Sequence, residues 1–403
     1  MQQSSLEGIF EDFLNHESVF INKDSLSIRY TPDSIPHRDI QINALAKVLA
    51  PCLRFERPSN IFIYGKTGTG KTLVVQRVCH QLEAIALKKQ VPLKVIYVNC
   101  KMRRVADTEY RLLAQLARDV GHNVPATGLP TDEIYKVFFN AIDTKEQVVI
   151  IVLDEIDRLV HKCGDDVLYN LTRINQELSK AKVCIIGISN DVTFTDDIDP
   201  RVKSSMNEEE MVFPPYDALQ IKDILLGRAK IGFAEDSCSD TVISKCAAYA
   251  ARDHGDARRA LDLLRVAGEL ADRDSKSNVD ESYVDFAEEK IEHDNIFEVV
   301  KHLPAQSQLL LYAGFILHET NNKAFFTGDL FGVYNDLCNK VGLKVLTQRR
   351  ISDLIAELDM LGLFNARVIS KGRYGRTREV NIGISSNSLV KVRALLDKQM
   401  GLN

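Results

Sequence analysis

The 403-residue sequence lacks any apolar run of the roughly 18 to 20 residues that a membrane-spanning helix requires. Its start, MQQSSLEGIFEDFLNHESVF, also lacks the basic residues and following apolar stretch of a secretory signal. No repeat of fixed period and no low-complexity linker interrupts the chain. These absences argue against a membrane or secreted protein and lead us to expect a cytoplasmic one.

The sequence also lacks a CxxC pair, although it contains eight cysteines. Pairs at that spacing are typical of metal sites and redox motifs. Most of the cysteines lie in apolar helical or strand patterns, so we expect reduced residues in the core. They are Cys52, Cys79, Cys100, Cys163, Cys184, Cys238, Cys246 and Cys338.

An overall excess of positive charge is absent too, because 51 lysines and arginines face 56 aspartates and glutamates. The net charge of −5 argues against a protein that coats nucleic acid with its whole surface. The charge is uneven, since residues 340–403 contain twelve lysines and arginines against five aspartates and glutamates. This C-terminal stretch is +7 and the remainder −12, so positive charge is concentrated near the C-terminus.

Apolar strand patterns alternate with helical patterns in the first half of the chain. They occur in SNIFIYG and at residues 94–99, 148–153 and 183–189. Such alternation indicates an α/β fold with a parallel sheet between helices. Purely helical patterns follow, and the last hundred residues combine helices with two strands. We expect three domains, at residues 1–215, 216–295 and 296–403.

Residues 65–72 read GKTGTGKT and lie between a strand and a helix. In that context the pattern GxxxxGK(S/T) is typical of a loop whose backbone N–H groups surround nucleotide phosphates. Lys71 would reach the β- and γ-phosphates, and Thr72 would bind Mg²⁺. The residues expected to bind the nucleotide here are Gly65, Lys66, Thr67, Gly68, Thr69, Gly70, Lys71 and Thr72.

Two adjacent carboxylates end the apolar strand VVIIVLDE. Asp154 and Glu155 lie at its carboxyl end, the end at which open α/β sheets bind ligands. We expect Asp154 to hold Mg²⁺ and Glu155 to orient or deprotonate the attacking water. This arrangement favours hydrolysis over simple binding, and a solvated helix cap is the alternative.

Three more residues are candidates for the same site. Asn190 ends the strand VCIIGISN and can hydrogen-bond the γ-phosphate or the water, unless it only forms a turn. Arg201, in DPRVKSS, either reaches the nucleotide of a neighbouring subunit or pairs on the surface. Arg258 lies in the first turn of the helix in GDARRALD and can lean over the phosphates, with Arg259 as the alternative.

The C-terminal region has a helix-turn-helix pattern followed by a basic hairpin. GLKVLT joins two helical patterns, and Gln348, Arg349 and Arg350 open the second, where they suit base edges and phosphates in the major groove. The hairpin tip suits the phosphate backbone and the minor groove, although a solvated charged edge is the alternative. The hairpin residues expected to contact DNA are Lys371, Arg373, Tyr374, Arg376 and Arg378.

Together these motifs resemble those of the AAA+ ATPases. In detail the chain is similar to the archaeal replication initiators related to the largest subunit of the origin recognition complex and to cell division control protein six. The similarity runs from about residue 18 to the C-terminus and includes RYTPDSIPHRDIQI, DEID, DPRVKSS, GDARRALD and FPPYDALQIKDIL. Tyr216, in the last of these motifs, would lie near the bound nucleotide. The similarity implies an AAA+ base, an all-helical lid and a C-terminal winged helix.

The resemblance also implies roles and partners. Ile35, Pro36 and Arg38 would lie near the adenine, Arg201 would act on a neighbouring subunit, and Arg258 would be the sensor in the lid. ATP or ADP with Mg²⁺ would be the cofactors, and double-stranded origin DNA in the nucleoid the main partner. A replicative helicase, and self-association or a paralogue on DNA, complete the expected partners.

Two other classes of protein use similar parts. A nucleotide-switched transcription regulator or signalling ATPase would use the winged helix for promoter or protein binding. A clamp-loader-type ATPase would bind DNA without sequence specificity and would need a collar domain in place of the wing. The entry segment RYTPDSIPHRDIQI and the basic hairpin favour an ATP-controlled replication initiator whose slow turnover acts as a switch.

Overall fold

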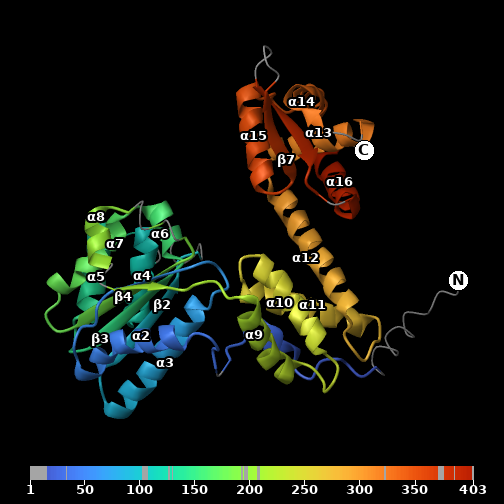
Figure 1. Ribbon diagram of the computed structural model, residues 1–403. Coiled ribbons are helices and arrows are strands. Elements are labelled where there is room, and N and C mark those ends of the chain that lie inside the picture. Colours follow the sequence, from blue (N-terminus) through green and yellow to red (C-terminus); the bar gives the residue numbers. More distant parts are fainter. Residues whose placement is uncertain are drawn as a thin grey trace. The chain divides into compact units, whose positions relative to one another are not determined.

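A computed structural model divides the chain into two compact units, Met1–Val284 and Asp285–Asn403, which are described separately (Figure 1). The structure describes residues 16–401, with gaps at residues 33, 102–107, 126–127, 129, 192–193, 195–197, 207–208, 322–323, 371–375 and 385. The helices in this part of the chain are all too short or too polar to cross a membrane.

Five parallel strands form the sheet of the first unit, in the order β2-β3-β4-β1-β5. Every residue of β3 is buried, as expected for a near-continuous apolar strand covered on both faces. The register pairs Asn99 with Asp154 and Tyr64 with Ser189, so these strands end at one edge of the sheet. The expected parallel α/β fold is confirmed. The strands are β1 Ile61–Tyr64, β2 Leu93–Asn99, β3 Val148–Asp154, β4 Lys182–Ser189 and β5 Glu209–Val212.

Helices cover both faces of this sheet because successive strand residues point to opposite sides. Val149 and Ile151 of β3 belong to an apolar cluster with helices α4 to α8, whereas Ile150 and Val152 pack with α2 and α3. The helices are α2 Asp39–Leu49, α3 Lys71–Lys89, α4 Glu109–Asp119, α5 Thr131–Ile142, α6 Ile156–Cys163, α7 Asp166–Arg173 and α8 Pro200–Met206, with 3₁₀ turns at Ala50–Arg54 and Ile174–Gln176.

Three helices of the first unit form the lid: α9 Ala218–Gly232, α10 Asp240–Arg252 and α11 Ala257–Arg273. Each begins after a residue whose side chain accepts a hydrogen bond from a backbone N–H of the first turn. These N-cap residues are Asp217, Ser239 and Asp256.

The N-terminal segment of residues 19–30, with a 3₁₀ turn at Lys23–Leu26, packs against the lid. The backbone amides of Ile21 and Asn22 donate to the Gly232 carbonyl at 2.9 and 3.0 Å. The ring of Phe20 lies 4.8 Å from that of Phe233, between centroids. Although this segment falls within the expected base of residues 1–215, its Val19 and Leu26 side chains are buried where it packs against the lid.

Helix α12 is the long helix Glu281–His302. It continues past residue 295, where a domain boundary was expected. The three-domain division therefore stays a prediction.

The second unit is a winged helix with the antiparallel strand order β6-β8-β7. Helix α15 buries Ile351, Leu354, Ile355 and Leu358, and Thr347 caps its start. The elements are α13 Ala305–Asn321, β6 Phe325–Phe326, α14 Thr327–Val341, α15 Gln348–Met360, β7 Phe364–Ser370, β8 Arg376–Ile382 and α16 Ser386–Met400.

The eight cysteines all lie in the described residues and none forms a disulfide. Burial raises the pKa of Cys52, Cys79, Cys100 and Cys238 to about 12, so these thiols stay protonated at neutral pH. Six of the eight are buried, in line with the expectation of core cysteines, and Cys163 and Cys238 are partly buried.

Two helical glycines test the packing of the N-terminal segment. A Cβ at Gly268 of α11 would lie 2.4 Å from the Phe20 ring, whereas a Cβ at Gly332 of α14 would meet nothing within 4 Å. We expect Gly268→Ala to lower the free energy of unfolding by about 1–3 kcal/mol through overpacking. Gly332→Ala should raise it by up to about 1 kcal/mol, because alanine favours helices. Denaturant unfolding measures both, and a stabilising Gly268→Ala would contradict the packing.

Candidate nucleotide site and nucleic-acid interface

The phosphate loop, residues 65–72, joins β1 to α3 and requires glycine at two crowded positions. Gly65 has φ +155°, and a Cβ there would lie 2.4 Å from the Phe213 carbonyl oxygen. Gly68 has φ +71°, and its Cβ would lie 1.7 Å from Asp256 Oδ1 at the start of α11. The loop can therefore contact both the end of β5 and the lid only because these side chains are absent.

Lys71 is buried behind the loop, with 5% of its surface exposed. Its Nζ donates to the carbonyls of Gly65 and Lys66 at 2.6 and 2.7 Å. It also donates to Asn190 Oδ1 at 2.9 Å, which places the end of β4 beside the loop. Burial lowers the pKa of Lys71 to about 8, although Asp154 acts in the opposite direction.

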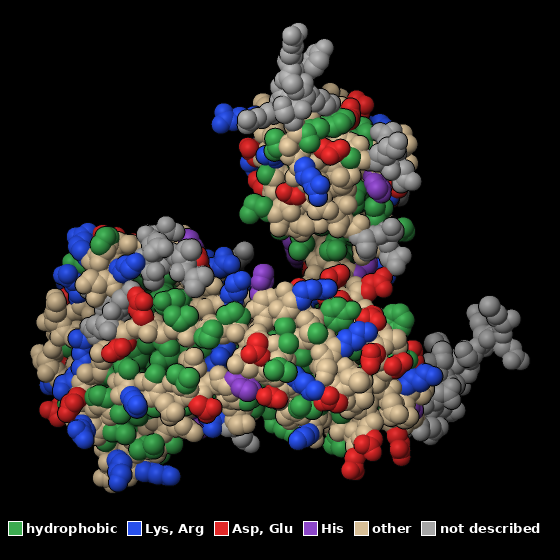
Figure 2. Space-filling view, in the orientation of Figure 1, with side chains coloured by type: hydrophobic (Ala, Val, Ile, Leu, Met, Phe, Trp, Pro, Cys, Tyr) green, Lys and Arg blue, Asp and Glu red, His purple; other side chains and the backbone are tan. Residues whose placement is uncertain are grey.

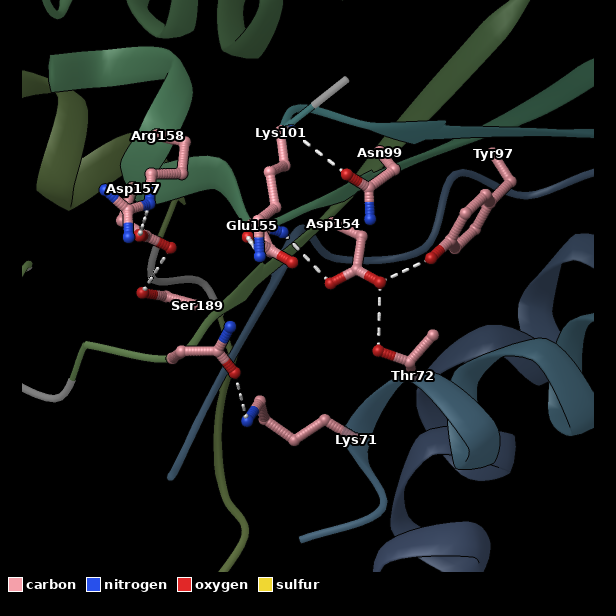
Figure 3. Close-up of polar contacts among 11 residues, drawn as sticks. Lys71, Thr72, Tyr97, Asn99, Lys101, Asp154, Glu155, Asp157, Arg158 and Ser189 are labelled. Carbon is pink, nitrogen blue, oxygen red and sulfur yellow. Dashed lines mark hydrogen bonds and ion pairs between the residues drawn. The ribbon is translucent and has the colours of Figure 1, made fainter. Parts of the chain in front are cut away.

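Three groups hold the Asp154 carboxylate at the end of β3 (Figure 3). Thr72 Oγ1 donates to Oδ2 at 2.9 Å, and the Tyr97 hydroxyl donates to the same oxygen. The Glu155 amide donates to Oδ1 at 2.9 Å. The expected pair of Thr72 and Asp154 is thus brought together, and Tyr97 is a contact that sequence reasoning missed.

Glu155 follows with a left-handed backbone, φ +55°, which turns the chain from β3 into α6. Its carboxylate lies 3.7 Å from the Lys101 ammonium (Figure 3). Asp157 is instead buried and accepts a hydrogen bond from Ser189 Oγ at 3.1 Å. Asp157 therefore joins α6 to β4.

A cavity of about 790 Å³ lies between the loop, the lid and the N-terminal segment. Of the residues expected near the adenine, Ile35 and Pro36 line it, together with Tyr216. Arg38 is not among the lining residues, because it is buried behind the loop. Several lining residues were not expected from the sequence: Ile28, Tyr30, Thr31, Gln76, Ile224, Gly227, Arg228, Ile231 and Leu261.

The two adjacent arginines of α11 have different surroundings. Arg258 lines the cavity. Arg259 turns away from it, and its guanidinium lies 2.8 Å from the Asp253 carboxylate. The helix orientation therefore favours Arg258 as the lid arginine of the site.

Arg201 lies at the start of α8, outside the residues that line the cavity. Its guanidinium pairs with Asp199 at 2.9 Å, and its side chain is 71% exposed. This position leaves the side chain accessible to a neighbouring molecule.

In the second unit Gln348, Arg349 and Arg350 are exposed on the first turn of α15. Arg350 also forms ion pairs with Asp353 and Glu357, at 3.8 and 3.4 Å. The expected hairpin residues Lys371, Arg373 and Tyr374 lie outside the described residues.

Two expected arginines of the hairpin lie in β8 and not at its tip. Arg376 begins the strand, and Arg378 pairs in register with Val368 of β7. The Arg378 guanidinium donates to the Ser352 carbonyl of α15 at 2.7 Å. Arg378 therefore connects the wing strand β8 to helix α15.

Figure 2 shows acidic and basic side chains interspersed on the visible face of the first unit. The basic residues considered for DNA contact belong to the second unit.

Three regions of the chain match known families. Residues 54–190 match the AAA domain, residues 222–289 the Cdc6 AAA+ ATPase-type lid domain, and residues 298–392 the CDC6 C-terminal winged helix domain. With its phosphate loop, lid and winged helix, the chain is a protein of the AAA+ class.

The chain is 54% identical over 389 residues to the ORC1-type DNA replication protein of Thermococcus onnurineus, covering 96% of this chain and 93% of that protein. It is 52% identical over 394 residues to ORC1-type DNA replication protein 1 of Methanosarcina mazei, covering 97% and 94%. The structure of the Aeropyrum pernix ORC1 protein in complex with DNA has a TM-score of 0.83 and 44% identity, covering 96% of this chain and 99% of that chain. The chain belongs to the family of ORC1-type DNA replication proteins.

Arg258 and Arg259 provide a matched pair of substitutions. Arg258→Ala should weaken ADP binding about tenfold, because a cation at the cavity wall is lost, and should leave the melting temperature unchanged. Arg259→Ala should leave ADP affinity unchanged and lower stability by at most about 1 kcal/mol, because its ion pair is partly exposed. Calorimetric titration and thermal unfolding separate the two effects. The opposite pattern would reverse the assignment.

Proposed function

We propose that this protein is an ATP-controlled DNA replication initiator that binds origin DNA in the nucleoid and recruits or loads the replicative helicase. The proposal rests mainly on the phosphate loop, which lines a cavity together with residues of the lid. The chain is also 44% identical to an ORC1 protein whose structure was solved in complex with DNA. Self-association, or pairing with a paralogue on DNA, belongs to the same proposal.

The cavity would hold ATP or ADP with the phosphates at the loop and the adenine against the apolar end of the wall. Ile35, Pro36 and Ile231 line that end and offer apolar surface to a purine ring. At the loop, Lys71 would exchange its bonds to the Gly65 and Lys66 carbonyls for bonds to phosphate oxygens. After this exchange the buried Lys71 ammonium would still be surrounded by oxygen acceptors.

The pair of Thr72 Oγ1 and Asp154 Oδ2, 2.9 Å apart, fits Mg²⁺. Both are hard oxygen donors, and two protein ligands suit an ion that keeps several waters and shares the phosphates. When bound, Mg²⁺ would neutralise negative charge on the phosphate oxygens. Tyr97 would hold the Asp154 carboxylate in place from the side of β2.

Hydrolysis would depend on residues around the terminal phosphate. Glu155 would orient or deprotonate the attacking water, and Asn190, already bonded to Lys71, would contact the γ-phosphate. Arg258 would stabilise negative charge from the lid. The exposed Arg201 would act on the nucleotide of a neighbouring subunit, which makes turnover dependent on assembly.

The winged helix would bind duplex DNA with two chemically different surfaces. Gln348, Arg349 and Arg350, on a rigid helix, would enter the major groove and address base edges and phosphates. The basic hairpin would contact the phosphate backbone and the minor groove. Strand β8 of the hairpin is joined to α15 by the bond from Arg378 to the Ser352 carbonyl.

Substitutions at two positions should separate nucleotide binding from hydrolysis. Lys71→Ala should abolish most ATP affinity, because the phosphates lose their buried cation. Glu155→Gln should retain ATP and lower the hydrolysis rate by at least about a hundredfold, because the water loses its base. Equilibrium titration with labelled ATP and single-turnover hydrolysis measure the two steps. Equal loss of binding in both variants would contradict these roles.

DNA titrations at several salt concentrations should distinguish the helix from the hairpin. Arg376→Ala should weaken origin and scrambled duplexes alike and reduce the salt slope by about one unit per lost phosphate contact. Arg349→Ala should cost about 1 to 3 kcal/mol on the origin duplex and spare the scrambled one. Lys391→Ala, on α16, serves as a control lysine. Unchanged affinity and slope for Arg376→Ala on both duplexes would mean that the hairpin is only a solvated edge.

A further inference from the structure

Arg38 is a buried cation at the point where the phosphate loop meets the start of the lid. Only 2% of its surface is exposed. Its Nε donates to the Thr69 carbonyl at 2.9 Å, and its other nitrogens donate to the carbonyls of Pro214 and His37 at 2.6 and 3.2 Å. Among the described residues no carboxylate pairs with it, so main-chain oxygens and the neighbouring Tyr216 side chain stabilise its charge.

Aromatic rings cover the faces of this guanidinium. Its central carbon lies 3.8 Å from the centroid of the Tyr216 ring and 5.6 Å from that of Phe213. Burial lowers the pKa of Arg38, but a guanidinium stays protonated at any physiological pH. The side chain is therefore a permanent charge held in a planar orientation.

The bond to Thr69 determines the orientation of the next amide in the loop. In a trans peptide the C=O and the following N–H point in opposite directions. Because the Thr69 carbonyl points at Arg38, the Gly70 N–H points away from Arg38, and Gly70 lines the cavity. A charge-assisted bond to the carbonyl also polarises the peptide and strengthens the N–H as a donor.

The bonds on the other side reach the linker between β5 and α9, where the lid begins. Pro214 and Tyr216 both belong to this linker. A Cβ at Gly70 would lie 2.9 Å from the Tyr216 hydroxyl, so loop and linker are in direct contact beside Arg38. One planar side chain therefore connects the loop peptide to the start of the lid.

We propose that Arg38 is a positioning residue for phosphate binding: through Thr69 it directs the Gly70 amide at the bound phosphate, and through Pro214 and Tyr216 it couples that amide to the lid. The proposal rests on the proposed nucleotide site and assigns Arg38 to the phosphate. It replaces the adenine contact that the resemblance implied.

Arg228 provides a matched control at the nucleoside end of the same cavity. It is also buried, 7% exposed, and donates to the carbonyls of Ser25 and Tyr30 at 2.9 and 3.1 Å. Its guanidinium carbon lies 4.5 Å from the Tyr30 ring centroid. The two arginines have the same chemistry, but the contacts of Arg228 are with the N-terminal segment and not with the phosphate loop.

The test compares Arg38→Met with Arg228→Met in the full chain, using ADP, adenosine and inorganic pyrophosphate in competition against a fluorescent ATP analogue. Arg38→Met should lower the affinity for ADP and pyrophosphate roughly tenfold or more, because an orienting charge-assisted bond is lost. Adenosine affinity should stay within about twofold, because it does not use the loop. Arg228→Met should lower ADP and adenosine affinity by a common factor.

Thermal unfolding of each variant establishes that it is folded. If Arg38→Met does not fold, Arg38→Lys keeps the charge without the planar fork and should show the same selective loss for phosphate-bearing ligands, smaller in size. An equal fall for ADP and adenosine, or no fall for ADP, would overturn the proposal. If the wild-type protein bound none of the three compounds, the proposed function itself would be overturned, and this inference with it.

Discussion

The buried ammonium of Lys71 is the constraint on which the first unit depends. A charge with 5% exposure is costly unless oxygen atoms surround it, and its pKa of about 8 reflects that cost. The loop satisfies this requirement by curling until two of its carbonyls reach the amine, and β4 satisfies it by ending at Asn190. The oxygen atoms of a bound phosphate could accept the same hydrogen bonds from Lys71.

The same loop contacts the lid without an intervening layer of side chains. Its Gly68 lies against Asp256, and the Ala257 amide points at the Gly68 carbonyl at 3.4 Å. Arg228 of the lid holds the N-terminal segment through the Ser25 and Tyr30 carbonyls, and Arg38, further along the chain, holds the loop through the Thr69 carbonyl. A nucleotide in this cavity would therefore contact base, lid and segment at once, which suits a switch.

The winged helix has a core of its own and its own polar connections. Phe325, Tyr334 and Phe364 are buried in it, and Arg378 links the wing strand to α15. The described basic residues of the C-terminal stretch therefore belong to a unit with its own packed core. This separation allows nucleotide chemistry and DNA binding to reside in different cores of one chain.

The features that the sequence alone determined are local ones. The loop pattern, the buried strand before Asp154 and the apolar face of α15 each depend on neighbouring residues, since periodicity and turn chemistry are set within a few positions. Contacts between segments that are distant in the sequence could not be predicted from such local patterns. That Tyr97 would reach Asp154 required knowing that β2 lies beside β3. Whether Arg258 faced the cavity depended on how α11 packs, and the role of Arg38 depended on the fold bringing three separate backbone segments around one side chain.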